Sequence, residues 1–153
     1  MTQSTYYNAL RVKWPTVAGA DTAARLAALN AETVAGPPRD VRTSEVLGFL
    51  ALAGLTTAIE DWVAANPMPS AARTAAKELL RIISSPHVQS IETSAPAKLA
   101  VVDGMLSALV AASVITAEHK TALLALAATT RPWWQASGYT APISANDLDA
   151  AGL

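Results

Sequence analysis

Hydrophobic residues recur three and four positions apart along most of the chain, the spacing that places them on one face of a helix. In one such segment this face is formed by Leu55, Ile59 and Trp62. Residues that favour helix N-termini, such as Ser70 and Thr116, stand before several of these segments. The pattern predicts an all-α chain, folded as a compact bundle of about six to eight short helices.

The longest apolar helix is predicted at about residues 95–113. Its large residues lie on one side and its small residues on the other: Leu99, Val102, Leu106, Leu109 and Val110, against Ala97, Ala100, Gly104, Ala108 and Ala111. A helix with two apolar faces is expected to pack on both, with a neighbour approaching closely on the small side. We therefore expect this two-faced helix at the centre of the bundle, where Asp103 needs a partner or a route to solvent.

The composition extends this picture to the surface of the protein. The length of 153 residues is typical of one domain, so we expect a single α-helical domain over residues 1–153. Charged residues make up only 15% of the chain, against about a quarter in an average domain. So few charges suggest that another protein covers part of the surface. The apolar stretch 99–115 contains Asp103 in its interior, which argues against a membrane span, and no membrane association is expected.

The sequence carries no pattern typical of an active site. Cysteine is absent, which excludes disulfides, thiolate metal sites and cysteine nucleophiles. His87 and His119 lack the spacing of a helical zinc site, and there is no glycine-rich phosphate loop. We expect a protein that is not an enzyme, with no cofactor, no metal and no small-molecule substrate; an enzyme with an unrecognised site is the least favoured alternative.

Six of the eight aromatic residues lie near the chain ends, in the segments 1–20 and 130–153. They are Tyr6, Tyr7 and Trp14 at the start and Trp133, Trp134 and Tyr139 near the end. Tyr and Trp side chains are favoured interface anchors because they bury a large area at little cost in entropy. Either these segments dock on a partner, or they fold back as lids on their own bundle. Trp133, Trp134 and Tyr139 are the first interface candidates and the N-terminal three the second.

A basic ridge recurs every four residues on one predicted helix, at Arg73, Lys77 and Arg81. Such a ridge can follow a phosphate backbone, but the aromatic side chains that stack on single-stranded bases are not interleaved with it. The net charge of −1 also provides no general attraction to nucleic acid. A solvated helix face is therefore the favoured interpretation, and a small regulatory or nucleic-acid-binding module is the alternative function.

Several short strings resemble parts of small α-helical proteins encoded by tailed bacteriophages. The strings are PWWQASGY at 132–139, PISANDL at 142–148, AAG at 150–152, LAALN at 26–30 with TV at 33–34, and SPHVQ at 85–89. Together they are spread over most of the chain. The resemblance implies a virion-associated, structural role and provides no active site.

These observations predict a non-enzymatic structural subunit of a larger assembly. With the resemblance, the expected assembly is a bacteriophage virion, at the capsid, neck or tail, and the expected location is the virion, or the host cytoplasm before assembly. The expected partners are proteins, either further copies of this chain or other virion proteins, while nucleic acid is not expected to be a partner.

Overall fold

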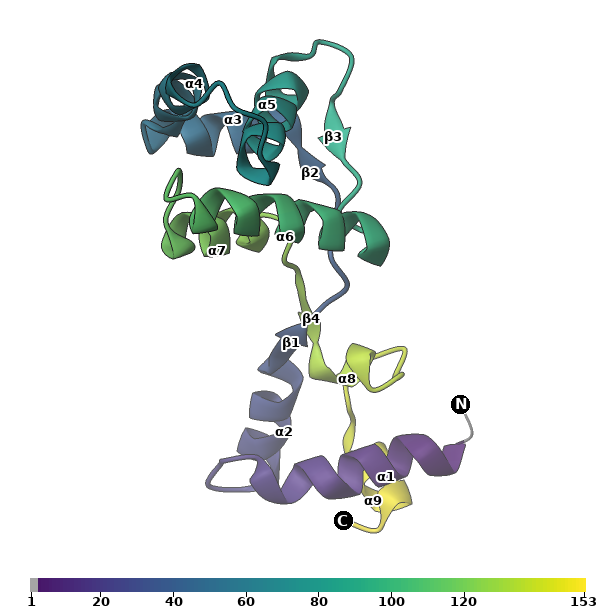
Figure 1. Cartoon of the computed structure of the whole chain (residues 1–153). Coiled ribbons are helices and arrows are strands. Elements are labelled where there is room, and N and C mark those ends of the chain that lie inside the picture. The colour runs from purple at the N-terminus through teal and green to yellow at the C-terminus, as the bar shows by residue number, and fades with distance from the viewer. Residues whose placement is uncertain (1–2) are drawn as a thin grey trace. The chain divides into compact units, whose positions relative to one another are not determined.

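The computed structural model describes the backbone of residues 3–153 and the side chains of residues 5–153. Over this part of the chain, the structure has nine α-helices, one short 3₁₀ helix and four strands of two or three residues (Figure 1). The predicted all-α class is confirmed, with one helix more than the expected maximum.

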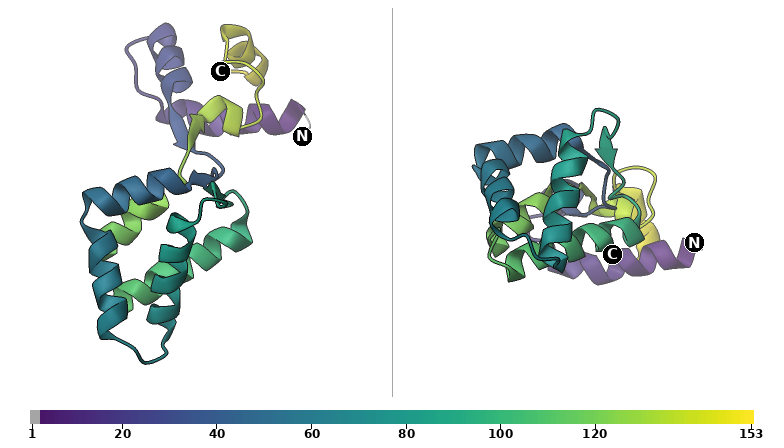
Figure 2. Two further views of the ribbon diagram at one scale, coloured as in Figure 1. Left: turned by 90° about the horizontal axis from the view of Figure 1, so that it is seen from above. Right: turned by 45° about the horizontal axis from the view of Figure 1, so that its top comes forward.

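The described residues divide into two compact units. The terminal unit comprises residues 3–36 and 129–153, and the inserted unit comprises Pro37–Ala128. In Figure 2 the purple N-terminal and yellow C-terminal segments belong to the terminal unit, and the teal and green helices belong to the inserted unit. The sequence predicts one domain over residues 1–153, whereas the structure has two hydrophobic cores, one in each unit.

The terminal unit consists of short helices joined by a two-stranded ribbon. Its elements are α1 (Gln3–Lys13), η1 (Trp14–Thr16), α2 (Thr22–Ala31), β1 (Thr33–Ala35), β4 (Thr130–Pro132), α8 (Trp133–Ala136) and α9 (Ala145–Ala151). Strands β1 and β4 pair antiparallel, with Thr33 opposite Pro132. The backbone N–H of Gly36 extends this pairing by donating to the carbonyl oxygen of Thr129 at 2.8 Å. The ribbon therefore joins segments from the two ends of the chain.

The inserted unit contains the longer helices. Its elements are β2 (Val41–Arg42), α3 (Thr43–Leu52), α4 (Leu55–Ala65), α5 (Ala71–Ser84), β3 (Ser90–Ile91), α6 (Pro96–Ala111) and α7 (Ala117–Ala125), with β2 and β3 paired antiparallel. The predicted N-caps Ser70 and Thr116 are confirmed, because their side-chain oxygens accept the backbone N–H groups of Arg73 and His119 at 3.1 Å. These caps satisfy amide donors that a helix start would otherwise leave unpaired.

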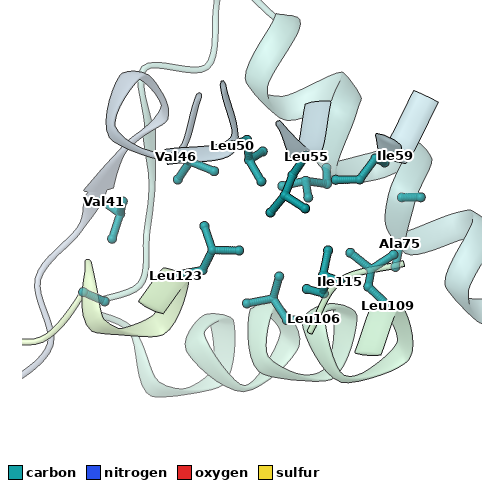
Figure 3. Packing of buried hydrophobic residues seen from close by; sticks show 13 residues of the cluster. Val41, Val46, Leu50, Leu55, Ile59, Ala75, Leu106, Leu109, Ile115 and Leu123 are labelled. Carbon is teal, nitrogen blue, oxygen red and sulfur yellow. The ribbon is translucent and has the colours of Figure 1, made fainter. Parts of the chain in front are cut away.

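The core of the inserted unit lies between α3, α4 and α5 on one side and α6 and α7 on the other. In Figure 3, Leu50 and Leu55 point toward Leu106 and Leu123. Helix α5 contributes small side chains such as the fully buried Ala76, which allow it to lie close to its neighbours. Burying each large side chain contributes about 1.5–3 kcal/mol relative to leaving it exposed.

Helix α6 corresponds to the predicted helix at 95–113, but most of its small-residue face is exposed. The side of large residues, including Leu106 and Leu109, is buried against the core. The opposite side is exposed at Ala97, Ala100, Gly104 and Ala111. A Cβ atom added to Gly104 would meet nothing within 4 Å. The expectation of a close neighbour is therefore wrong at these four residues. The fifth, Ala108, is half-buried against the core, and with Gly104 it lines a depression that Ala71 and Ala75 of α5 also line.

The charged residue inside α6 has the partner that its position requires. The carboxylate of Asp103 lies 2.9 Å from the ammonium of Lys120 on α7, and the Asp103 side chain is half exposed. Lys120 also donates to the hydroxyl of Ser107 at 2.7 Å. Asp103 therefore has both a partner and a route to solvent, where the sequence predicted a need for one of them.

Candidate interaction surface

The aromatic residues from both chain ends lie together in the terminal unit. Its buried core comprises Leu10, Trp14, Val17, Leu29, Ile143, Leu148 and Ala151. Four further aromatic side chains pack half-buried against this core: Tyr7, Trp133, Trp134 and Tyr139. The predicted segments 1–20 and 130–153 thus contribute their aromatic rings to one hydrophobic cluster.

The sixth aromatic residue, Tyr6, packs against Tyr139. Their ring centroids are 5.7 Å apart and the rings are tilted by 48°. The hydroxyl of Tyr139 donates to the carbonyl oxygen of Tyr6 at 3.1 Å. Burial raises the pKa of Tyr139, and the negative charge of Asp147 raises it further. Tyr139 therefore remains a protonated donor at neutral pH and ties the C-terminal segment to α1.

Trp14 is 7% exposed and is held from inside the terminal unit. The guanidinium of Arg25 lies over its ring, 4.3 Å from the centroid, an arrangement typical of a cation–π contact. Arg25 also donates to the carbonyl oxygen of Val17 at 3.1 Å and to that of Trp14. In this conformation Trp14 has little surface to offer a partner, and its role is to fix the turn between α1 and α2.

The side chain of Asn30 clamps the C-terminal segment onto α2. Its Oδ1 accepts the backbone N–H of Ile143 at 2.8 Å, and its Nδ2 donates to the carbonyl oxygen of Ile143 at 2.9 Å. One amide side chain thus pairs both backbone groups of a residue that is 2% exposed. Two further hydrogen bonds join the N-terminal and C-terminal segments. The Trp133 N–H donates to the Glu32 carbonyl at 2.8 Å, and Arg11 Nε donates to the Ala151 carbonyl at 2.6 Å.

An open depression of about 570 Å³ lies on the terminal unit beside Trp133. It is lined by Asn8, Ala9, Val12, Lys13, Thr16 and Trp133. Val12 is 78% exposed, an unusual position for a valine, while Trp133 is half-buried and forms the other apolar wall. The structure thus places one of the predicted interface residues at a surface depression, and adds Val12 to it.

The basic ridge on α5 is interrupted. Arg81 is paired with Glu78 of the same helix through two hydrogen bonds, and this pairing lowers the pKa of Glu78 and raises that of Arg81. Arg73 has its Nε atom shielded from solvent without a hydrogen-bond partner. Lys77 is exposed and forms no ion pair with another described residue. Only part of the predicted ridge is therefore a free positive charge.

Other large apolar side chains are exposed on the inserted unit. They are Leu47, Leu52, Met68 and Val101. Leu47 and Leu52 lie on α3, and Leu52 is 94% exposed. Among the described residues, no single helix is long and apolar enough to span a membrane; α3 and α4 meet that criterion only together, across a bend of 84°.

The described residues contain no group of three His, Cys, Asp or Glu side chains placed to hold a metal ion. The imidazole of His119 accepts the Thr116 N–H at 3.3 Å as part of a helix cap, and its ring contacts Phe49 edge-on. Inside the inserted unit, an apolar cavity of about 40 Å³ is lined by residues that include Val102 and Ala127.

Comparison with protein families, curated proteins and solved structures finds no match for this chain.

Sequence reasoning missed Val12 and Asn30. Val12 could have been found, because the apolar spacing of Tyr7 and Leu10 on α1 places position 12 on the opposite face of the helix. A valine on the outer face of a short helix is a recognisable signal. Asn30 gave no such signal, because its partner Ile143 lies 113 positions away and local spacing does not relate them.

Proposed function

We propose that this chain is a non-enzymatic structural subunit of a larger assembly and acts through protein–protein contacts. The resemblance of its short strings to small tailed-phage proteins supports a virion component, at the capsid, neck or tail, as that assembly. The observation that carries the proposal is the depression beside Val12 and Trp133.

This depression has the properties of a docking surface. Val12 and Trp133 together offer apolar area to solvent that a partner would remove from water, at about 25 cal/mol per Å². Tryptophan is among the residues that contribute most to binding when a partner covers it. The hydrogen bond from the Trp133 N–H to Glu32 and the β1–β4 pairing fix the backbone on the Trp133 side of the depression. A surface that is already ordered costs little entropy on binding.

Incorporation into the natural assembly tests the proposal. Val12→Asp places a charge in the depression without touching the core, because Val12 is 78% exposed. The matched control is Leu52→Asp, which introduces the same charge at a residue that is 94% exposed on the inserted unit. Each variant is expressed in cells that produce the assembly, and its amount in purified particles is measured by mass spectrometry. Circular dichroism verifies that both variants are folded.

We expect Val12→Asp to be lost from the particles and Leu52→Asp to enter them like the wild type. Trp133→Ala is expected to reduce incorporation as well, with some loss of stability because Trp133 also packs on the core. Normal incorporation of folded Val12→Asp would contradict the proposal, as would complete absence of the wild-type chain from purified particles.

A further inference from the structure

Glu32 stands between α2 and β1 and holds residues from both sides of the depression beside Val12 and Trp133. Its carboxylate lies 2.5 Å from the ammonium of Lys13, the last residue of α1. Its backbone carbonyl oxygen accepts the N–H of Trp133 at 2.8 Å. Lys13 lines the depression from the side of α1, and Trp133 lines it from α8. Glu32 does not line the depression itself, so it can affect the depression only through these two residues.

The backbone and the side chain of Lys13 are held by different partners. The hydroxyl of Thr16, which also lines the depression, donates to the carbonyl oxygen of Lys13 at 2.7 Å. The ammonium of Lys13 is paired with Glu32, and the Lys13 side chain is 25% exposed. A lysine packs its methylene stem on apolar surface while its charged head stays in water or beside a carboxylate. The Glu32 carboxylate therefore keeps the stem of Lys13 in place as part of the α1 wall.

The same ion pair sets the charge of the depression. Among the described residues that line it, Lys13 is the one that carries a charge. A partner that covers the depression removes this ammonium from water, which is costly for a cation that has no carboxylate beside it. With Glu32 as its partner, the ammonium keeps its counter-charge when it is covered. The depression is then suited to an uncharged, apolar segment of another protein.

We propose that Glu32 is a positioning residue for docking, which holds Lys13 in the α1 wall and compensates its charge. This inference rests on the proposed function, because it concerns the same surface. Glu32 acts through Lys13, so its effect on docking should disappear when position 13 carries no ammonium. A carboxylate that only stabilised the fold would not show this dependence in a measurement of docking.

Competition for places in the natural assembly tests the role of Glu32. Glu32→Gln removes the negative charge and keeps the backbone carbonyl that accepts the Trp133 N–H. The variant is expressed together with the wild-type chain in cells that produce the assembly. Mass spectrometry compares the ratio of the two chains in purified particles with their ratio in the cell extract. We expect Glu32→Gln to enter the particles about two- to fivefold less often than the wild type, the range that a partly exposed ion pair can contribute.

The matched control is Glu45→Gln in the inserted unit. Glu45 is paired with Arg39, and its side chain is 33% exposed, against 36% for Glu32. The same substitution therefore breaks a similar ion pair in the other unit. We expect Glu45→Gln to enter the particles like the wild type. Circular dichroism and urea unfolding measure the stability that each variant has lost, so that unfolded chain is not mistaken for a failure to dock.

A second background provides the readout that a purely structural role would not change. Lys13→Met keeps an unbranched apolar side chain at position 13 and has no ammonium to compensate. Glu32→Gln is therefore measured both in the wild-type chain and in a chain that carries Lys13→Met. In the Lys13→Met chain, Glu32→Gln should have little further effect on incorporation, whereas independent contributions of the two residues would multiply.

Two results would overturn the inference: incorporation of Glu32→Gln no lower than that of Glu45→Gln, or an equal loss from Glu32→Gln with and without Lys13→Met. Val12→Asp, measured in the same particles, separates this failure from failure of the proposed function. If Val12→Asp is excluded while Glu32→Gln enters normally, the depression docks on a partner without help from Glu32. If Val12→Asp enters normally, the proposed function fails and the role of Glu32 in docking fails with it.

Discussion

Replacing Asn30 with alanine should release the C-terminal segment from the terminal unit. The substitution removes both hydrogen bonds to Ile143, at 2.8 and 2.9 Å. Because Ile143 is 2% exposed, water does not easily replace them, and both backbone groups are left unpaired. Each unpaired buried group costs about 1–3 kcal/mol. With partial relaxation of the segment, we expect the free energy of unfolding of the terminal unit to fall by about 2–4 kcal/mol.

The tryptophans allow this unit to be observed separately. Trp62 is the tryptophan of the inserted unit, and the other three lie in the terminal unit. In a Trp62→Phe background, tryptophan fluorescence during urea unfolding therefore reports on the terminal unit. The far-ultraviolet circular dichroism signal reports on the helices of both units.

The matched control is Asn66→Ala, which removes one hydrogen bond of the same kind from an exposed helix end. We expect it to change the free energy of unfolding of the terminal unit by less than about 0.5 kcal/mol. If Asn30→Ala changes the free energy of unfolding of the terminal unit by less than about 0.5 kcal/mol, or destabilises both units equally, the role of the Asn30 hydrogen bonds is refuted.

Two further predictions concern the inserted unit. Gly104→Ala should raise the free energy of unfolding of the inserted unit by about 0.5–1 kcal/mol, because alanine favours the helix and the added Cβ meets nothing within 4 Å. Lowered stability in urea unfolding would show that the small-residue face of α6 is occupied. Glu45 accepts two hydrogen bonds from Arg39 and one from the Arg42 N–H, which lower its pKa from its usual 4.5 to about 2. The contribution of Glu45 to stability is therefore complete above pH 4.5 and is lost as the pH falls toward 2. Glu45→Gln should lose less stability than the wild type between pH 7 and pH 2.5. Urea midpoints of the two proteins that change in parallel with pH would contradict this prediction.

The helices could be predicted because their signals are local. The apolar spacing of α4 and the caps at Ser70 and Thr116 each involve residues within a few positions of one another. The four strands could not be predicted, since strands of two or three residues are too short to show alternation. The pairing of Thr33 with Pro132 also joins positions about a hundred residues apart, which no local pattern relates.

The two-unit organisation was hidden for a related reason. Hydrophobic spacing shows which face of a helix is buried, but not which other helix covers it. The aromatic residues Tyr7 and Trp133 were noticed as a group because they lie near the two ends of the chain. That they enter one core depends on the long-range β1–β4 pairing and on the Asn30 clamp.

The small face of α6 shows the limit of composition as a guide to packing. Ala97, Ala100 and Gly104 have the spacing of a close helix contact, yet they are exposed. Small residues permit a close approach without requiring one. The same sequence signal therefore fits both a packed and an open helix face, and only the tertiary structure distinguishes them.

Site-specific photo-crosslinking in the natural assembly tests the central claim most directly. A photoreactive residue is placed at position 12, beside Trp133, and in separate proteins at positions 52 and 101, which are also exposed apolar sites. After irradiation of purified assemblies, the crosslinked products are identified by mass spectrometry. The account predicts one defined intermolecular product from position 12 and much weaker crosslinking from positions 52 and 101. Strong crosslinking from position 52 or 101, with none from position 12, would contradict it.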